Sequence, residues 1–387
     1  MLFFKLFNFF FYMSFAPMNY LNMYLRDIGL SSVQIGSIHS GARLVALMVL
    51  PLWGVISDYY KANKKLLLVA LSGSIIFMFT FLTTQQFTYI FIIMILFLMF
   101  SSPIIPLADS LLLSHLNTKS NLYGRYRVYG SYGFTLLVLI VGIYLEKTTT
   151  SNLFYLCGAF LFFTLLSTTK LPQGKKALKV TNLKNFKILF RNKELFLFLL
   201  YTFFIQLTFQ VNMIYFPIYV MDHGGREALL GVAMMLAAGS EIIIFIYSEK
   251  FIELFKIKYL FLVSAITFTL RWILLAYFPI NTVMVGSQLL NGLSFALFHV
   301  IAIYFINLII ADEFKATGMN LYAVTAGISR IIGSFFGGIV YEKMGGFELY
   351  TYCEIITFII GLSYFMFLNS KDKKFFNTEE KKEIQSI

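Results

Sequence analysis

Long apolar segments recur along nearly the whole chain and constrain its fold more than any other feature. Hydrophobic residues make up 59% of the 387 positions and charged residues 13%, whereas a soluble protein is about 45–50% apolar and about 25% charged. A transmembrane helix needs roughly 20 apolar residues to cross a hydrocarbon core of about 30 Å. The sequence therefore predicts an all-α polytopic membrane protein with twelve transmembrane helices. They are expected at about residues 3–25, 33–57, 66–84, 88–115, 126–145, 152–169, 195–221, 229–248, 258–277, 282–309, 319–341 and 348–368.

A strongly basic segment interrupts this pattern in the middle of the chain. Residues 170–193 contain eight Lys and Arg residues and no acidic residue, and so many positive charges favour a cytoplasmic loop. We expect an N-terminal six-helix half at 1–169, a cytoplasmic linker at 170–194, a C-terminal half at 195–369 and a charged cytoplasmic tail at 370–387. Two such halves are typical of secondary transporters that work by alternating access.

The net charge of +12 is explained by membrane topology. With six helices before the linker, both termini lie on the cytoplasmic side, and most of the 31 basic residues then fall in cytoplasmic segments. No basic motif with interleaved aromatic residues is present to read a base, so we expect no nucleic-acid partner. The predicted location is the cytoplasmic (inner) membrane.

Cys157 and Cys353 both lie inside apolar runs, where they offer neither a disulfide framework nor a metal-ligand spacing. We expect no metal and no cofactor.

A few charged residues lie inside the predicted helices, where each needs a partner or a wet cavity. Asp109 and Arg127 belong to consecutive antiparallel helices joined by a short loop, so they are expected to form an ion pair. Such a pair either faces a central cavity and exchanges partners with a substrate, or only holds two helices in register. The others are Arg43, Glu241, Arg271, Arg330 and Glu354.

Two side chains are candidates for proton coupling. Glu241 is a lone carboxylate late in an apolar helix, and its alternative role is a structural pair with Arg271 or Arg330. His299 is either a proton carrier or a helix-packing residue. It shares an i, i+3/i+4, i+7 stripe with Gln288, Asn291 and Phe295, so these residues are expected on one helix face.

The first predicted helix carries polar and aromatic residues that are unusual in hydrocarbon. Asn19 and Asn22 share a face with Tyr12, and Tyr20 lies on another face. Asparagine in a membrane must find an interhelical hydrogen bond or a wet cavity, whereas aromatic stripes are usually packing residues.

Several motifs resemble the major facilitator superfamily. Gly54-Val-Ile-Ser-Asp58, followed by Lys61, Lys64 and Lys65, is similar to the superfamily signature of the first cytoplasmic turn, although Ala62-Asn63 departs from it. The segments 103–111 and 123–134 resemble the fourth and fifth helices of the lactose permease-like and phenylpropionate permease-like branch. Segments 29–36, 241–245, 289–299 and 321–338 resemble the phenylpropionate permease-like side.

The resemblance implies the major facilitator fold and specific roles for several residues. In lactose permease an acidic residue and an arginine form the sugar-binding ion pair and an aromatic residue stacks on the sugar; the matching positions here are Asp109, Arg127 and Phe134. Asn291 and Ser294 stand where lactose permease has its histidine and coupling glutamate, which is a departure from lactose-type coupling. Arg330 matches a lysine whose aspartate partner is missing here.

Together these observations predict a proton-coupled symporter of a small organic solute, such as a sugar, a nucleoside or an aromatic acid. It is expected to act as a monomer in the bilayer. The alternatives are a proton-independent facilitator or an exporter of the same fold, a membrane enzyme acting on a lipid-linked substrate, and a receptor that has lost transport. The candidate residues are, for substrate binding, Asp109, Arg127, Phe134, Asn19, Tyr20, Gln288 and Asn291; for proton coupling, Glu241 and His299; and for gating, Gly54, Asp58, Lys64, Lys65, Arg271 and Arg330.

Overall fold

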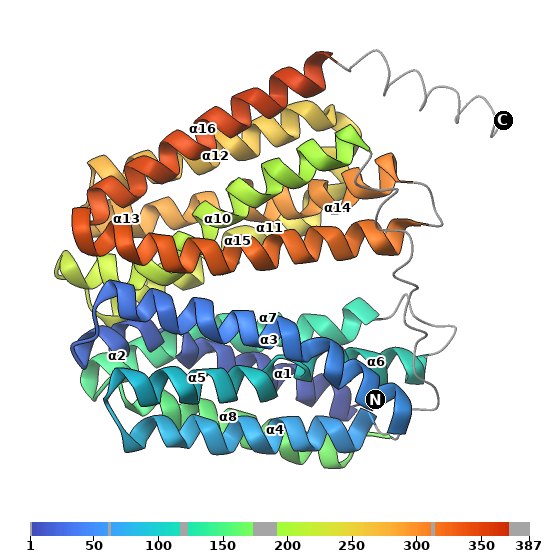
Figure 1. Ribbon diagram of the computed structural model, residues 1–387, viewed down its shortest axis with the longest axis vertical. Helices are drawn as coiled ribbons and strands as arrows, with labels where there is room; N and C mark the ends of the chain where they lie inside the picture. The colour runs from blue at the N-terminus through green and yellow to red at the C-terminus, as the bar shows by residue number, and fades with distance from the viewer. Residues whose placement is uncertain (1, 61–62, 117–122, 173–191, 311–313, 371–387) are drawn as a thin grey trace.

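The computed structural model describes residues 2–60, 63–116, 123–172, 192–310 and 314–370 (Figure 1). Most of the predicted linker at 170–194 and nearly all of the predicted tail at 370–387 lie outside these residues. The described part is almost entirely helical and contains no strand. This is the expected consequence of a bilayer, because a helix satisfies its backbone hydrogen bonds within one segment.

The helices of the first half run from α1 to α8. Their bounds are α1 Leu2–Met18, α2 Leu21–Asp27, α3 Ser32–Tyr60, α4 Asn63–Thr80, α5 Phe87–Ser101, α6 Ile104–Leu116, α7 Tyr123–Lys147 and α8 Asn152–Thr169. The second half contains α10 Lys193–Asp222, α11 Glu227–Leu254, α12 Ile257–Tyr277, α13 Asn281–Ser287, α14 Leu297–Ile309, α15 Lys315–Met344 and α16 Gly346–Ser370. A 3₁₀ turn (Gln288–Leu290) and a π-helical turn (Gly292–Ala296) join α13 to α14.

Eleven helical stretches of the described residues are long and apolar enough to cross a membrane. The first predicted helix is missing from this set because it consists of two pieces, α1 with 17 residues and α2 with seven. The break falls at Asn19, whose side-chain amide donates to the Phe15 carbonyl at 2.8 Å and so competes with the helical backbone ladder. The fourth predicted helix also breaks, between α5 and α6, just before Pro103, where proline removes a backbone donor.

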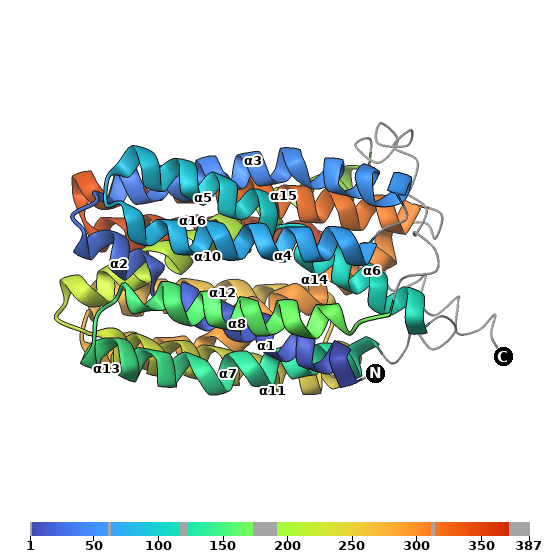
Figure 2. The ribbon, with the colours of Figure 1, turned by 90° about the horizontal axis from the view of Figure 1, so that it is seen from below.

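The helices form two groups that lie side by side (Figure 1). In the first, α1 packs against α7 and α8, and α3 against α5. In the second, α12 packs against α16, and α10 against α15. The groups meet along two helix pairs, α3 with α15 and α7 with α11, on opposite sides of the bundle (Figure 2).

Polar contacts between the two groups gather at the end of the bundle where α2 lies and where α3 and α11 begin. We call this the closed end. The Asn22 side-chain amide donates to the Ile214 carbonyl at 3.0 Å, and Arg26 forms an ion pair with Asp222 at 3.7 Å. Two backbone amides donate to glutamates of the other group, Val33 to Glu342 at 2.8 Å and Ala228 to Glu146 at 3.1 Å. The two groups are therefore held together by polar bonds at the closed end.

Candidate functional site

A cavity of about 390 Å³ lies between the two groups of helices. Its walls come from α1 and α7 on one side and from α10, α11 and the π-helical turn on the other. It brings together five of the residues that the sequence singled out, Asn19, Arg127, Phe134, Glu241 and Asn291. We call it the central cavity.

Arg127 forms the charged part of the α7 wall. Its guanidinium carbon lies 3.7 Å from the centre of the Tyr12 ring, in a cation–π contact. Gly130 makes this contact possible, because a Cβ there would collide with the Tyr12 ring and press on Arg127. Tyr12 was only one member of an aromatic stripe in the sequence; no local signal marked it as the partner of an arginine on another helix.

Asp109 lies apart from the central cavity, and this differs from the expectation. Among the described residues no ion pair within 4.0 Å joins Asp109 to Arg127. The carboxylate instead interacts with the Tyr123 side chain and, through space, with Arg127. Tyr123 stands one turn before Arg127 on α7, so it reaches Asp109 first.

Glu241 belongs to a buried polar network on the opposite wall. The Asn291 side-chain amide donates to the Glu241 carboxylate at 2.5 Å, and Arg271 donates to the Asn291 carbonyl oxygen at 2.6 Å. Arg271 also donates to Gln288. Arg271 and Gln288 are each only 1% exposed, so Asn291 carries the contact between a buried cation and the carboxylate that lines the cavity.

The π-helical turn places Asn291 in this network. Its Gly292 amide donates to the Ser240 hydroxyl at 2.9 Å, and a Cβ on Gly292 would collide with the Ser240 carbonyl. Helix α11 and the turn therefore approach closely beside Glu241. Single π turns inside helices are frequent at functional sites.

Two aromatic rings complete the wall from the second group. Phe209 and Phe295 stack in parallel with their centres 4.2 Å apart, and both line the cavity with Phe134 on the other side. Phe295 was part of the predicted stripe, whereas Phe209 carried no signal in the sequence. Flat apolar faces of this kind suit a ring-shaped solute.

The other predicted binding and coupling residues lie behind these walls. Tyr20 is fully buried and its hydroxyl donates to the Val138 carbonyl at 2.7 Å, so it packs against α7. His299 lies 3.1 Å from the Tyr322 hydroxyl and stacks on Phe295. Arg330 interacts electrostatically with both Tyr322 and His299.

The residues of the predicted gating motif lie at the other end of the bundle. Lys64 donates to the carbonyls of Thr169 and Leu171 at 2.8 and 2.6 Å, where a cation offsets the free carbonyls at the end of α8. Gly54 has open space around it and Lys65 is exposed. The Asp58 side chain lies outside the described residues.

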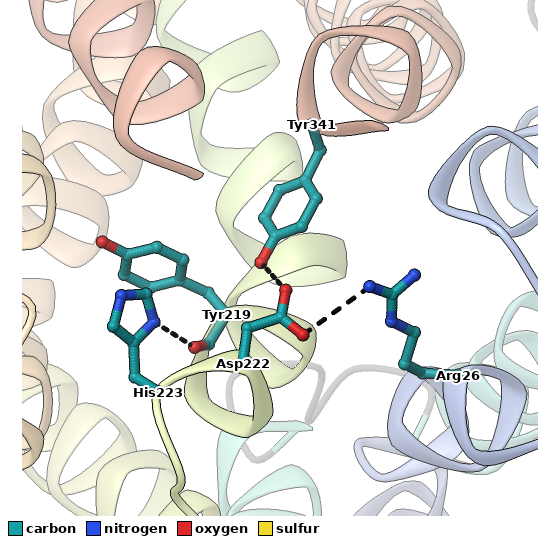
Figure 3. A network of polar contacts seen from close by, with 5 residues as sticks. All are labelled: Arg26, Tyr219, Asp222, His223 and Tyr341. Atoms are coloured by element: carbon teal, nitrogen blue, oxygen red, sulfur yellow. Dashed lines mark hydrogen bonds and ion pairs between the residues drawn. The ribbon is translucent and has the colours of Figure 1, made fainter. Parts of the chain in front are cut away.

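At the closed end, Asp222 is held from both groups of helices, and Figure 3 shows the arrangement. Arg26 of α2 approaches it to 3.7 Å, and the Tyr341 hydroxyl of α15 donates to it at 2.7 Å. His223 follows it and lies 2.8 Å from the Tyr219 carbonyl. Arg26 and Asp222 lie 196 positions apart, and no local sequence pattern predicts their contact.

The family of the chain follows from a comparison with known proteins. A family model described as "MFS_1 like family" matches residues 1–352. The chain belongs to the MFS_1 like family. Members of this family are major facilitator superfamily transporters rather than enzymes, so the chain is a multi-pass membrane transporter of small molecules with the major facilitator fold.

Relatives of known sequence agree with this assignment. The uncharacterized transporter YwbF of Bacillus subtilis (strain 168) is 27% identical over 357 residues, covering 91% of this chain and 90% of its own. The maltose permease of Geobacillus stearothermophilus is 27% identical over 374 residues, with 96% and 95% covered. The putative nucleoside transporter YegT of Escherichia coli (strain K12) is 22% identical, with 91% and 89% covered.

Solved structures show the same fold. The nucleoside transporter NupG superposes with a TM-score of 0.82 at 18% identity, covering 94% of this chain and 98% of its own. A bacterial homolog of the human lysosomal transporter Spinster, in an inward-facing and unoccupied conformation, superposes with a TM-score of 0.69 at 12% identity, covering 94% and 95%.

Proposed function

We propose that this MFS_1 like protein is a proton-coupled symporter that moves one small organic solute at a time through the central cavity. The observation that carries the proposal is the composition of that cavity. A cation from one group of helices, Arg127, and a carboxylate from the other, Glu241, line the same space. Charged side chains inside a membrane usually mark a substrate or ion pathway.

The solute class follows from the walls. Phe209, Phe295 and Phe134 offer apolar faces for a ring, while Asn19, Arg127 and Asn291 offer hydrogen-bonding groups at its edge. A sugar, a nucleoside or an aromatic acid meets both demands. Maltose and nucleosides appear in the names of the relatives described above, and 3-phenylpropionic acid in that of a probable Escherichia coli transporter 25% identical over 347 residues.

Proton coupling is assigned to Glu241. A coupled cycle needs a group that is neutral in one state and charged in another. Asn291 joins Glu241 to Arg271, so a shift of the π-helical turn would change how strongly the cation favours the charged carboxylate. His299 lies outside the cavity lining and is the second candidate.

Alternating access supplies the movement. The polar contacts at the closed end hold α2 and α3 against α10 and α15, and their release would open the cavity on that side. We place the closed end outside the cell and both termini in the cytoplasm. The halves at 1–169 and 195–369 then rock about the central cavity in a monomer of the cytoplasmic membrane. Gly54, Asp58, Lys64 and Lys65 act in gating at the cytoplasmic end, with Arg271 and Arg330 inside the second half.

Uptake by the purified protein in proteoliposomes tests this function. A panel of labelled sugars, nucleosides and aromatic acids is offered with and without an imposed inward proton gradient. We expect one class to accumulate against its gradient only when the proton gradient is present. Uptake that equilibrates but never accumulates would make the protein a proton-independent facilitator.

A further inference from the structure

A second cavity of about 300 Å³ lies within the first group of helices, among α1, α3, α5 and α8. We call it the side cavity. No described residue lines both it and the central cavity. Its polar lining includes His39 and Arg43, which lie one turn apart on α3, and Ser102 at the break between α5 and α6.

These three residues each carry a buried polar atom without a hydrogen-bond partner. The atoms are Nδ1 of His39, Nη1 of Arg43 and the hydroxyl oxygen of Ser102. His39 is only 7% exposed. An unmet buried donor or acceptor costs about 1–3 kcal/mol, and more for a charged group. Three such unpartnered atoms around one cavity indicate that the cavity holds a polar ligand.

The charge of the side cavity is positive and uncompensated. No Asp or Glu of the described part of the chain lines it, and the charged group that acts on Arg43 is another arginine, Arg330 of α15. A cation inside a membrane protein normally has an anionic partner. The missing partner is therefore an anion from solution.

Most of the remaining lining is apolar and defines the body of that anion. Phe11, Phe15, Met94, Phe97 and Leu98 face the same space, and such side chains favour a carbon skeleton over a hydrated inorganic ion. We propose that the side cavity binds a small organic carboxylate, whose carboxyl group bridges Arg43, His39 and Ser102.

Each bound carboxylate brings one proton with it. Asn22 donates its amide to the Ile214 carbonyl at 3.0 Å, so its carbonyl oxygen, 2.6 Å from His39 Nε2, accepts the Nε2 proton. His39 Nδ1 then meets the ligand either as a second protonated donor or as the acceptor of a carboxylic acid proton. Among the described residues, the other charged or titratable groups around it are Arg43, Arg330 of α15 and Cys157 of α8, none of which is a carboxylate.

Calorimetric titration of the detergent-solubilised full chain with benzoate tests the proposal, and benzamide serves as the neutral control. We expect benzoate to bind roughly tenfold or more tightly than benzamide, because a charge-assisted bond to arginine is lost in the amide. Titrations in buffers of different ionisation enthalpy should report about one proton taken up per benzoate.

Four variants locate the binding. Arg43→Gln should weaken benzoate binding roughly tenfold or more, and Arg43→Lys should weaken it less. His39→Gln keeps an amide that can donate to Asn22 but loses the Nδ1 position, so proton uptake should disappear. Lys147→Gln, which removes an exposed charge at the end of α7, should leave benzoate binding unchanged. Thermal unfolding without ligand verifies that each variant is folded.

Absence of benzoate binding, or equal binding of benzamide, would overturn the proposal. So would benzoate binding that survives Arg43→Gln and disappears in Arg127→Gln, since that locates the acid in the central cavity. Binding is measured here without transport, so either result leaves the proposed transport function untouched.

Discussion

Glu241 and Arg271 are joined through Asn291 rather than by direct contact. The amide of Asn291 donates to the carboxylate at 2.5 Å and its carbonyl accepts from the guanidinium at 2.6 Å. One neutral side chain thus bonds to two charged ones. Glu241 lies on α11, Asn291 just before the π-helical turn and Arg271 on α12. Any movement of that segment changes the surroundings of both charges at once.

Glu241→Gln should uncouple solute from protons. Glutamine keeps an oxygen that accepts from Asn291, so the network and the binding of solute should survive, whereas the group that gains and loses a proton is gone. We expect normal exchange of labelled solute across proteoliposomes and no accumulation driven by a pH gradient. His299→Gln is the control, and it should weaken binding more than coupling, since His299 stacks on Phe295 of the cavity wall. Undiminished accumulation in Glu241→Gln would remove this residue from the coupling step.

Arg127→Gln should weaken solute binding more than Asp109→Asn does. Arg127 lines the central cavity and Asp109 does not, and loss of a charged hydrogen bond costs about 1.5–3 kcal/mol, or roughly tenfold to a hundredfold in affinity. Binding of the transported solute to purified protein measures both variants. Equal losses would show instead that the two residues pair directly in the solute-bound state, as the sequence alone suggested. Transport restored in the double neutral variant would show that the pair only joins α6 to α7.

The helical fold was predictable because the bilayer forces apolar segments of about 20 residues into helices. The interruptions of the helices were less predictable. The apolar pattern did not reveal the break at Asn19, where a side chain competes with the backbone. It also did not reveal the π-helical turn at Gly292, where Ser240 of another helix approaches closely. Contacts of this kind depend on packing between helices and leave no period in the sequence.

The site was predictable in part for the same reason. Helical spacing and resemblance selected Arg127, Phe134, Glu241 and Asn291, which all line the central cavity. They also selected Tyr20 and Asp109, which the structure places elsewhere, because spacing fixes a helix face but not which neighbour a side chain meets. The partner residues Tyr12 and Phe209 required the packed structure.

Gly130→Ala should disturb the Arg127 site without removing any of its polar groups. The added Cβ would collide with the Tyr12 ring, so Tyr12 must move away from Arg127 or α7 must shift against α1. We expect weaker solute binding and a loss of stability of about 1–3 kcal/mol, as for other overpacked sites. Gly124→Ala on the same helix is the matched control, because a Cβ there meets nothing within 4 Å. Equal behaviour of the two variants in thermal unfolding and binding would show that the Tyr12–Arg127 contact does not shape the site.

Arg26→Gln and Asp222→Asn should each loosen the closed end. Both side chains are 36% exposed, and an exposed ion pair contributes at most about 1 kcal/mol, so the open population should rise by no more than about fivefold. Asparagine at 222 still accepts from Tyr341, so the substitution removes only the ion pair.

A Ser32→Cys reporter measures the effect of these variants. The Ser32 carbonyl lies against Gly338 of α15 and Ser32 is 1% exposed, while the native cysteines are buried. The rate of labelling by a maleimide should rise equally in the two single variants. It should rise no further in the double variant, because each single substitution already removes the same ion pair. Asp27→Asn is the control, because Asp27 accepts from Thr150 within its own half. A rate that rises as much in Asp27→Asn, or that doubles again in the double variant, would show that the Arg26–Asp222 pair does not hold the closed end.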